Sequence, residues 1–342
     1  MVALYVASSE EAAGKTTICA GVGRHLLDEG KKVGFLKPIL ADKRPGEDSD
    51  SDTVFMKQVL ALSEPVDSLC PLISGEGVLT NKAKQTYAKV SQGKDVVIIE
   101  GMCGHSPDDN LSKTSYEIVE ALKASVIVVG GYSNQSSTAK FINTCKGFGE
   151  NLLGVVLNKV PSSQLKRVHD EIPPQFAEVE INILGILPED RALFTLTIGE
   201  LVDCIQGEIL NNAEKSTELV ENFMVGAMYV DSGLEYFGRK RGKAVVVRDD
   251  RPDMQLAALE TPTKCLVISG DTAPVYSVRY RAEDKGVPII LTKSDTSTIL
   301  KSIEDALDKT RFNQEKKLLK LAEITGQHLS FQAISKGLGL AD

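Results

Sequence analysis

The sequence predicts an α/β protein, in which a parallel sheet carries helices on both of its faces and a smaller α/β domain follows. Short runs rich in β-branched residues alternate with longer stretches of helical periodicity along the chain. These runs are almost continuously apolar, which is typical of strands that are covered on both faces. With 342 residues, the chain is long enough for two or three domains.

Six of the apolar runs predict the strands of the first sheet. They lie at residues 3–7, 32–37, 95–100, 125–130, 153–159 and 181–187. Connections between neighbouring parallel strands are almost always right-handed crossovers, so the segments between these runs are expected to be helical. Ligands of such sheets bind at the carboxyl ends of the strands, and the residues directly after each run are therefore candidates for function.

The chain is expected to divide into three parts, residues 1–212, 213–310 and 311–342. The stretch "NNAEKSTE" at 211–218 is polar and has no apolar period, which indicates a boundary near residue 212. Beyond it, "KAVVVR", "KCLVIS" and "VPIILT" each lead into a helical stretch and predict a small α/β domain. Residues 311–342 predict a terminal helix that packs on a neighbouring element.

Composition narrows the classes of function. The chain is 42% hydrophobic and 25% charged, and no run approaches the ~18 apolar residues of a membrane helix, so we expect a soluble protein with no membrane partner. The start of the chain shows no secretion signal, which predicts a cytoplasmic location. A net charge of −8 argues against a nucleic-acid partner. The six cysteines and four histidines lack metal-ligand spacing.

The stretch "LYVASSEEAAGKTTICAG" at residues 4–21 ends like a phosphate-binding loop. In the motif G-x-x-x-x-G-K-[ST], Gly14, Lys15 and Thr16 supply the end, and Ser9 stands at the first glycine. Glycine lets backbone amides approach phosphate, the lysine brings a charge to the β- and γ-phosphates, and the threonine hydroxyl reaches Mg²⁺. These residues and Thr17 are the expected nucleotide contacts. A loop that only starts a helix is the alternative.

Carboxylates follow two of the predicted strands and suggest a metal site. Glu100 ends the run "VVIIEG", and "DSDSDT" places Asp48, Asp50 and Asp52 after the second run. Nucleotide-bound Mg²⁺ takes one or two carboxylates and a hydroxyl, so Thr16, Asp52 and Glu100 form a candidate set. Taken singly, Glu100 also fits a strand-end acid and Asp52 a helix N-cap.

Other polar residues follow the second, fifth and sixth runs. Lys37, in "FLKPI", is expected to face the same strand ends and to act with Lys15 as a catalytic residue, unless it is a surface lysine. Asn158 in "GVVLNKV" and the pair Pro188 and Glu189 in "GILPEDR" lie where a nucleotide base can be hydrogen-bonded.

Together these motifs resemble the dethiobiotin synthetase branch of P-loop proteins across most of the first domain. The resemblance rests on the phosphate loop, Lys37-Pro38, the Asp52 segment, "VVIIEG", "GVVLNKV" and "GILPEDR". It implies that ATP and Mg²⁺ bind, with Lys15 and Thr16 on phosphate and metal, Asp52 and Glu100 assisting the metal, and Asn158 near the base. The chain departs from the branch at the start of the loop and in "EGMCGH".

The later strands resemble a DRTGG domain, a CBS-related module of regulatory proteins. Asp250 and Arg251 supply its D-R pair, and "SGD" at 269–271 stands where the family often has Thr-Gly-Gly. A local turn network, with Asp253 as the N-cap of the following helix, is the alternative for these residues. The order of the two domains resembles the N-terminal half of long phosphate acetyltransferases.

The resemblances imply a MgATP-binding regulatory protein related to the non-catalytic region of phosphate acetyltransferase. Its expected partners are a nucleotide, an enzyme of acetate or acetyl-CoA metabolism and further copies of itself, and weak ATP hydrolysis is compatible with this function. The alternative is an ATP-dependent ligase that activates a carboxylate or carbamate, with Lys37 beside the substrate. Acetyl transfer is not expected.

Overall fold

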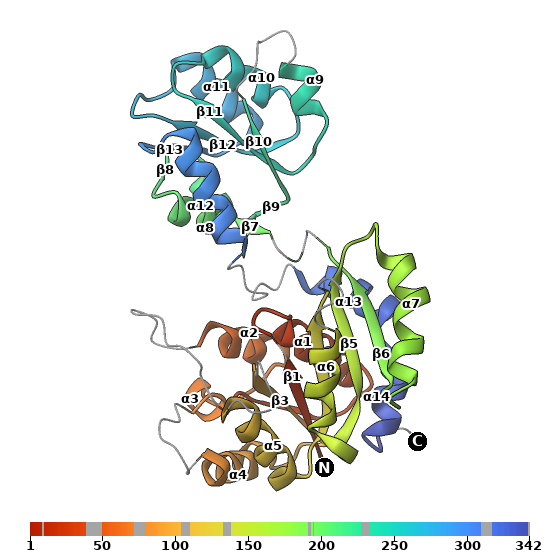
Figure 1. The fold of residues 1–342 in the computed structure, drawn as a ribbon. Helices are drawn as coiled ribbons and strands as arrows, with labels where there is room; N and C mark the ends of the chain where they lie inside the picture. The colour runs from red at the N-terminus through yellow and green to blue at the C-terminus, as the bar shows by residue number, and fades with distance from the viewer. Residues whose placement is uncertain are drawn as a thin grey trace. The chain divides into compact units, whose positions relative to one another are not determined.

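The computed structural model describes residues 1–8, 10–38, 50–71, 79–103, 110–132, 138–190, 193, 195–226, 233–308 and 317–340. The chain forms two compact units, residues 1–190 together with 311–342 and residues 191–310 (Figure 1). Among the helices of the described ranges, none has both the length and the apolar character that crossing a membrane takes.

The first unit is built on a parallel sheet of six strands in the order β2-β3-β1-β4-β5-β6. The strands are β1 (Val2–Ser8), β2 (Val33–Leu36), β3 (Val96–Cys103), β4 (Ser125–Gly131), β5 (Leu152–Val160) and β6 (Ile183–Pro188). Each overlaps a predicted run. In the central strand β1, Leu4, Tyr5 and Val6 have no exposed surface, as the continuous apolar pattern predicted.

Helices cover both faces of this sheet (Figure 1). They are α1 (Lys15–Asp28), α2 (Ser51–Val59), α3 (Val66–Leu69), α4 (Leu79–Val90), α5 (Asn110–Leu122), α6 (Thr138–Lys146) and α7 (Leu165–Ala177), with a 3₁₀ turn, η2 (Gly149–Asn151). Helix α1 begins directly after Gly14 and packs against β1, β2 and β3. The carboxyl end of β1 therefore leads straight into the amino end of α1.

The end of the chain returns to the first unit as two helices, α13 (Leu318–His328) and α14 (Phe331–Gly337). Helix α13 packs on α1 and β6. A Cβ atom at Gly21 of α1 would lie only 2.8 Å from Cγ2 of Thr325, so the two helices approach closely there. The ring of His25 stacks on that of Phe331 with centroids 3.8 Å apart. Helices α13 and α14 are thus part of the first unit.

The second unit has a five-stranded sheet in the order β10-β11-β12-β13-β8. Four strands are parallel, and the short β8 pairs antiparallel with β13. The strands of this unit are β7 (Leu196–Thr197), β8 (Glu208–Ile209), β9 (Leu219–Val220), β10 (Asn222–Val225), β11 (Lys243–Arg248), β12 (Thr263–Ser269) and β13 (Ile289–Thr292). Its helices are α8 (Ile198–Cys204), η4 (Ala213–Thr217), α9 (Gly233–Gly238), α10 (Pro252–Leu259), α11 (Tyr276–Lys285) and α12 (Thr296–Asp308).

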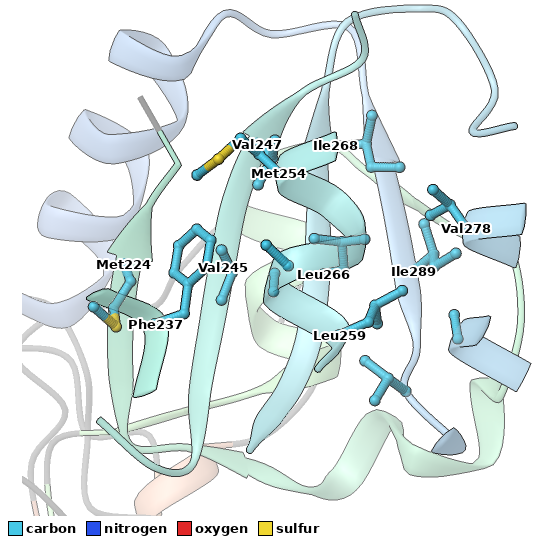
Figure 2. Packing of buried hydrophobic residues seen from close by; sticks show 14 residues of the cluster. Met224, Phe237, Val245, Val247, Met254, Leu259, Leu266, Ile268, Val278 and Ile289 are labelled. Carbon is cyan, nitrogen blue, oxygen red and sulfur yellow. The ribbon is translucent and has the colours of Figure 1, made fainter. Parts of the chain in front are cut away.

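Alternate residues of β11 and β12 enter two different cores, one on each face of the second sheet. Val245 and Leu266 belong to the core that also contains Met254 of α10 and Phe237 of α9 (Figure 2). The other core takes the intervening residues of the same strands together with side chains of α8 and α12, such as Ile299. Burial on both faces explains why "KAVVVR" and "KCLVIS" are almost wholly apolar.

The second unit begins earlier than the expected boundary at residue 212. Ile198 and Leu201 of α8 are fully buried in its core, and β8 closes one edge of its sheet. The polar stretch at 211–218 is a surface turn inside this unit, since η4 and the strands around it belong to residues 191–310. The polar composition correctly indicated an exposed connection at 211–218. Exposed connections occur within domains as well as between domains, so the stretch did not mark the boundary.

Candidate nucleotide-binding site

The phosphate-type loop lies between β1 and α1 and is held by a side chain from β5. Gly14 has φ 98°, in the left-handed region that favours glycine. Nδ2 of Asn158 donates a hydrogen bond of 2.9 Å to the carbonyl oxygen of Ala13, and it occupies the space that a Cβ atom at Gly14 would need. Asn158, expected near a base, therefore contacts the loop backbone itself.

Lys15 and Thr16 begin α1 and point toward two different polar partners. The Nζ atom of Lys15 donates to Oγ of Ser8 over 2.9 Å, and the Ser8 hydroxyl donates to the carbonyl oxygen of Glu10 over 2.8 Å. Oγ1 of Thr16 donates to Oε1 of Glu100 over 3.0 Å. The ammonium and the hydroxyl that the motif requires thus lie near the carboxyl ends of the neighbouring strands β1 and β3. Thr17, the next residue of α1, is buried.

Glu10 joins the loop to β4, a contact that the sequence did not indicate. Its Oε1 atom accepts a hydrogen bond of 2.6 Å from the backbone N–H of Gly131, the last residue of β4. A Cβ atom at Gly131 would collide with this carboxylate, so the contact depends on glycine at that position. The first acid of the loop is therefore directed toward the sheet, whereas Glu11 is exposed.

Three carboxylates surround the ammonium group of Lys37, just beyond β2. Nζ lies 3.1 Å from both carboxylate oxygens of Asp50, 2.8 Å from Oδ2 of Asp52 and 3.7 Å from Oε1 of Glu100. The side chains are between 2% and 12% exposed, so the cluster is shielded from water. The predicted metal ligands Asp52 and Glu100 and the predicted catalytic Lys37 therefore belong to one buried group of charges.

Asp50 is fixed in this cluster by the helix that it starts. It is the N-cap of α2, and its Oδ2 atom accepts hydrogen bonds from the backbone N–H of Thr53 at 2.9 Å and from the Thr53 hydroxyl at 2.7 Å. Burial alone would raise the pKa of Asp50, but the charge of Lys37 and the Thr53 hydrogen bonds outweigh burial and lower it. The N-cap role, which was the alternative for Asp52, belongs to Asp50.

The same charges shift the pKa values of Lys37 and Glu100. Burial alone would lower the pKa of Lys37, but the negative charges of Glu100, Asp52 and Asp50 outweigh burial and raise it. Burial raises the pKa of Glu100, and Asp52 adds to this, while Lys37 and Lys15 oppose it. Lys37 is therefore a permanent cation at neutral pH.

The oxygen atoms of this site fit the Mg²⁺ ion that the resemblance implies. Oε2 of Glu100 is buried and has no hydrogen-bond partner among the described residues, although the other oxygen accepts from Thr16. Two carboxylates and a hydroxyl are hard oxygen ligands of the kind that Mg²⁺ takes alongside nucleotide phosphates. Within the described ranges, no group of three or more His, Cys, Asp or Glu side chains could hold a metal ion.

Pro188 and Glu189, the other predicted base contacts, lie where β6 ends. Pro188 ends β6 opposite Val160 of β5, and the backbone N–H of Glu189 donates to the carbonyl oxygen of Val160 over 2.7 Å. Both residues lie on the carboxyl edge of the sheet that also carries Asn158. Ser9 and Asp48 lie outside the described residues.

In the second unit, the predicted D-R pair forms contacts with its sequence neighbours. Nε and Nη2 of Arg251 lie 3.0 and 2.9 Å from the two carboxylate oxygens of Asp253, and Arg248 pairs with Asp250 at 2.6 Å. Helix α10 begins at Pro252 with Arg251 as its N-cap, so Asp253 lies in the first turn and does not have the N-cap role that the alternative interpretation gave it. The local network that the alternative foresaw is present.

The wound parallel sheet and its Gly-Lys-Thr loop define the class of P-loop α/β proteins, here joined to a second, smaller α/β unit. Residues 2–195 match the AAA domain family, and the chain belongs to this family. Residues 200–306 match the DRTGG domain family. Both domain types predicted from the sequence are thereby confirmed.

Among the proteins that are similar to the chain are two curated relatives and one solved structure. Phosphate acetyltransferase of Nitrosomonas europaea is 24% identical over 336 residues, which cover 91% of this chain and 47% of the relative. ATP-dependent dethiobiotin synthetase of Caldicellulosiruptor saccharolyticus is 29% identical over 182 residues, which cover 46% of this chain and 74% of the relative. The CBS and DRTGG domains of the regulatory region of Clostridium perfringens pyrophosphatase, complexed with the activator diadenosine tetraphosphate, share 20% identity over 42% of this chain and 60% of that chain, with a TM-score of 0.31.

The chain spans about half the length of the phosphate acetyltransferases that it matches. It is related to that half of the enzyme, and the predicted relationship to phosphate acetyltransferase is confirmed at this level.

Proposed function

We propose that the first unit binds MgATP and that the protein acts as a nucleotide-responsive regulator. The observation that carries the proposal is the meeting of Lys15, Thr16 and Glu100 where β1 and β3 end. A cation, a metal-binding hydroxyl and a buried carboxylate with a spare oxygen meet there at the start of a helix, whose free N–H groups and dipole favour an anion.

Each residue has a definite part in this binding. The Lys15 ammonium and the amides of the loop receive the phosphates, and Asn158 holds the loop in the shape that exposes those amides. Thr16, Asp52 and Glu100 are the ligands that hold Mg²⁺. The ion neutralises phosphate charge when it is bound. Ser9, Thr17, Pro188 and Glu189 complete the proposed contacts.

A regulatory function is supported by the domain that follows the P-loop unit and by the relatives that span most of the chain. The domain is a DRTGG domain, and these relatives are phosphate acetyltransferases. We infer that nucleotide binding changes an association of this chain, with an enzyme of acetate or acetyl-CoA metabolism or between copies of the chain, in the cytoplasm. Such coupling requires the nucleotide to bind the two states of association with different affinity.

Calorimetric titration of the full chain with ATP and Mg²⁺ tests the binding. We expect Lys15→Ala to weaken binding at least about tenfold, because a charged hydrogen bond to phosphate is lost. Lys94→Ala is the matched control, because this lysine also pairs with a carboxylate, Glu64 at 3.1 Å. Lys94 precedes β3 and therefore lies at the amino ends of the strands, opposite the proposed site. Equal affinity of Lys15→Ala and the unmodified chain would refute the proposed site.

The ligase expected as an alternative is less supported by the geometry. Lys37 was the residue expected beside its substrate, and its ammonium is enclosed by Asp50, Asp52 and Glu100. The dethiobiotin synthetase relative matches less than half of the chain. ATP turnover that rises on addition of a diamine and bicarbonate would establish a ligase instead of a regulator.

A further inference from the structure

One ammonium group occupies the middle of the carboxylates that are expected to hold the metal. Lys37 Nζ is within 4 Å of three carboxylates, and two of these, Asp52 and Glu100, are the proposed Mg²⁺ ligands. As they stand, both face a side-chain cation.

The third carboxylate keeps the lysine in this place. Asp50 contacts Nζ through both of its oxygens at 3.1 Å, is 2% exposed, and is itself held by the backbone and hydroxyl of Thr53. Its position is therefore set by the start of α2. Asp50 is not one of the proposed Mg²⁺ ligands, so it would remain the partner of Lys37 if Asp52 and Glu100 bound a metal ion.

We propose that Lys37 is an internal cation that blocks metal capture by Asp52 and Glu100 until a nucleotide arrives. This inference rests on the proposed binding of MgATP. Lys37 is in this view a positioning residue, which fixes the two carboxylates and sets the order in which ligands bind, and it makes no contact with the reacting atoms.

The charges explain how the block works. Three carboxylates and one ammonium leave two negative charges in a site shielded from water, where charges interact several times more strongly than in solution. A metal ion that enters alone must compete with an ammonium already in contact. A metal ion that enters with a nucleotide also gains phosphate oxygens as ligands, and the phosphates gain Lys15. Removing the ammonium takes away the nearest cation of Asp50, Asp52 and Glu100, so the negative charge that attracts a divalent cation rises.

The test is binding of Mn²⁺, a spectroscopic substitute for Mg²⁺, to the full chain without nucleotide, followed by electron paramagnetic resonance. We expect Lys37→Met to bind Mn²⁺ at least about tenfold more tightly than the unmodified chain, because a neighbouring positive charge is removed. Lys37→Gln is neutral and also keeps hydrogen-bond donors. It carries the test if the methionine variant does not fold. Lys37→Arg, which keeps the charge, and Lys94→Met, at the other edge of the sheet, should bind Mn²⁺ as weakly as the unmodified chain.

The outcomes separate this inference from the proposed function. The inference is supported if both neutral variants bind Mn²⁺ more tightly than the unmodified chain and Lys37→Arg binds it no more tightly than the unmodified chain. Equal Mn²⁺ binding by the unmodified and neutral variants overturns it, even if calorimetry shows that ATP binds at Lys15. Failure of the unmodified chain to bind ATP with Mg²⁺ removes the proposed function by a separate measurement.

Discussion

Asn158 donates a hydrogen bond from Nδ2 to the carbonyl oxygen of Ala13 over 2.9 Å, so a side chain at the end of β5 holds the phosphate-type loop. The two residues are 145 positions apart, and both are buried. The bond fixes the carbonyl of Ala13, next to Gly14. Loop shape in this protein thus depends on the fifth strand as well as on the loop sequence.

Replacing this amide tests its role in the loop. We expect Asn158→Ala to lower ATP affinity about fivefold to tenfold, because loss of one buried hydrogen bond costs about 1 kcal/mol and frees the loop backbone. Asn222→Ala removes an exposed bond of the same atoms and length, from Nδ2 to the carbonyl of Arg241 at 2.9 Å in the second unit. Unchanged ATP affinity in Asn158→Ala, measured by calorimetry beside this control, would contradict the role.

Gly14 is expected to tolerate no side chain. Gly14→Ala puts a Cβ atom at φ 98° and into the space of the Asn158 amide. We expect ATP binding to be lost and the free energy of unfolding to fall by about 1–3 kcal/mol. Gly30 also has positive φ, 80°, but no atom lies within 4 Å of the place of its Cβ. Gly30→Ala should therefore lower the free energy of unfolding by only about 1 kcal/mol and leave ATP affinity unchanged. If both variants lost ATP affinity to the same extent, the contact between residue 14 and Asn158 would not be the cause.

Much of the fold and part of the site could be predicted from local sequence patterns. The strands of the first sheet, and β11, β12 and β13 of the second, coincide with apolar runs that are visible without tertiary information, because these strands are buried on both faces. The short β8 and the half-buried β10 of the second sheet were not predicted. Gly14, Lys15 and Thr16 were identified because their spacing is itself the chemical requirement. Their meeting with Glu100 follows from the rule that the carboxyl ends of parallel strands share one edge.

The contacts that were missed join residues whose proximity depends on the folded chain. The carboxylate of Glu10 reaches the backbone of Gly131, and backbone partners leave no signal in a sequence. Asp50 was noted only as one acid of a series, and its selection as the partner of Lys37 depends on where α2 begins. The early start of the second unit did leave a signal: Thr197 and Glu200 form a capping box in the spacing T-x-x-E.

A buried lysine at the start of β11 predicts a pH dependence of stability. Lys243 has no exposed surface, its Nζ donates to the carbonyl oxygen of Pro262 at 3.0 Å, and burial lowers its pKa to about 8. The unfolded chain, with a lysine pKa near 10.5, holds this proton between pH 8 and 10.5 when the folded chain has lost it. The free energy of unfolding should therefore rise with pH across this window, by on the order of 3 kcal/mol at most.

Lys243→Met should remove that pH dependence and stabilise the protein at pH 7, because no charge then has to be buried. The measurement is chemical denaturation of both proteins at pH 7, 8, 9 and 10. Lys264→Met on the neighbouring strand removes a partly exposed lysine that pairs with Glu218, and it should leave the slope between pH 8 and 10 as it is. A slope that persists in Lys243→Met would assign it to another group.

The helix at the end of the chain offers a prediction with a control on the same helix. Leu321 of α13 is 1% exposed against the first unit, and Leu319, two residues earlier, is 86% exposed. Leu321→Ala should lower the free energy of unfolding by about 2–4 kcal/mol through lost burial and a cavity, whereas Leu319→Ala should change it by less than about 0.5 kcal/mol.

Because α13 packs on α1, which starts with Lys15, Leu321→Ala should also make the first unit more sensitive to protease, and bound ATP should reverse part of this increase in sensitivity. Equal stability of the two variants would mean that the terminal helices do not pack on α1 in solution.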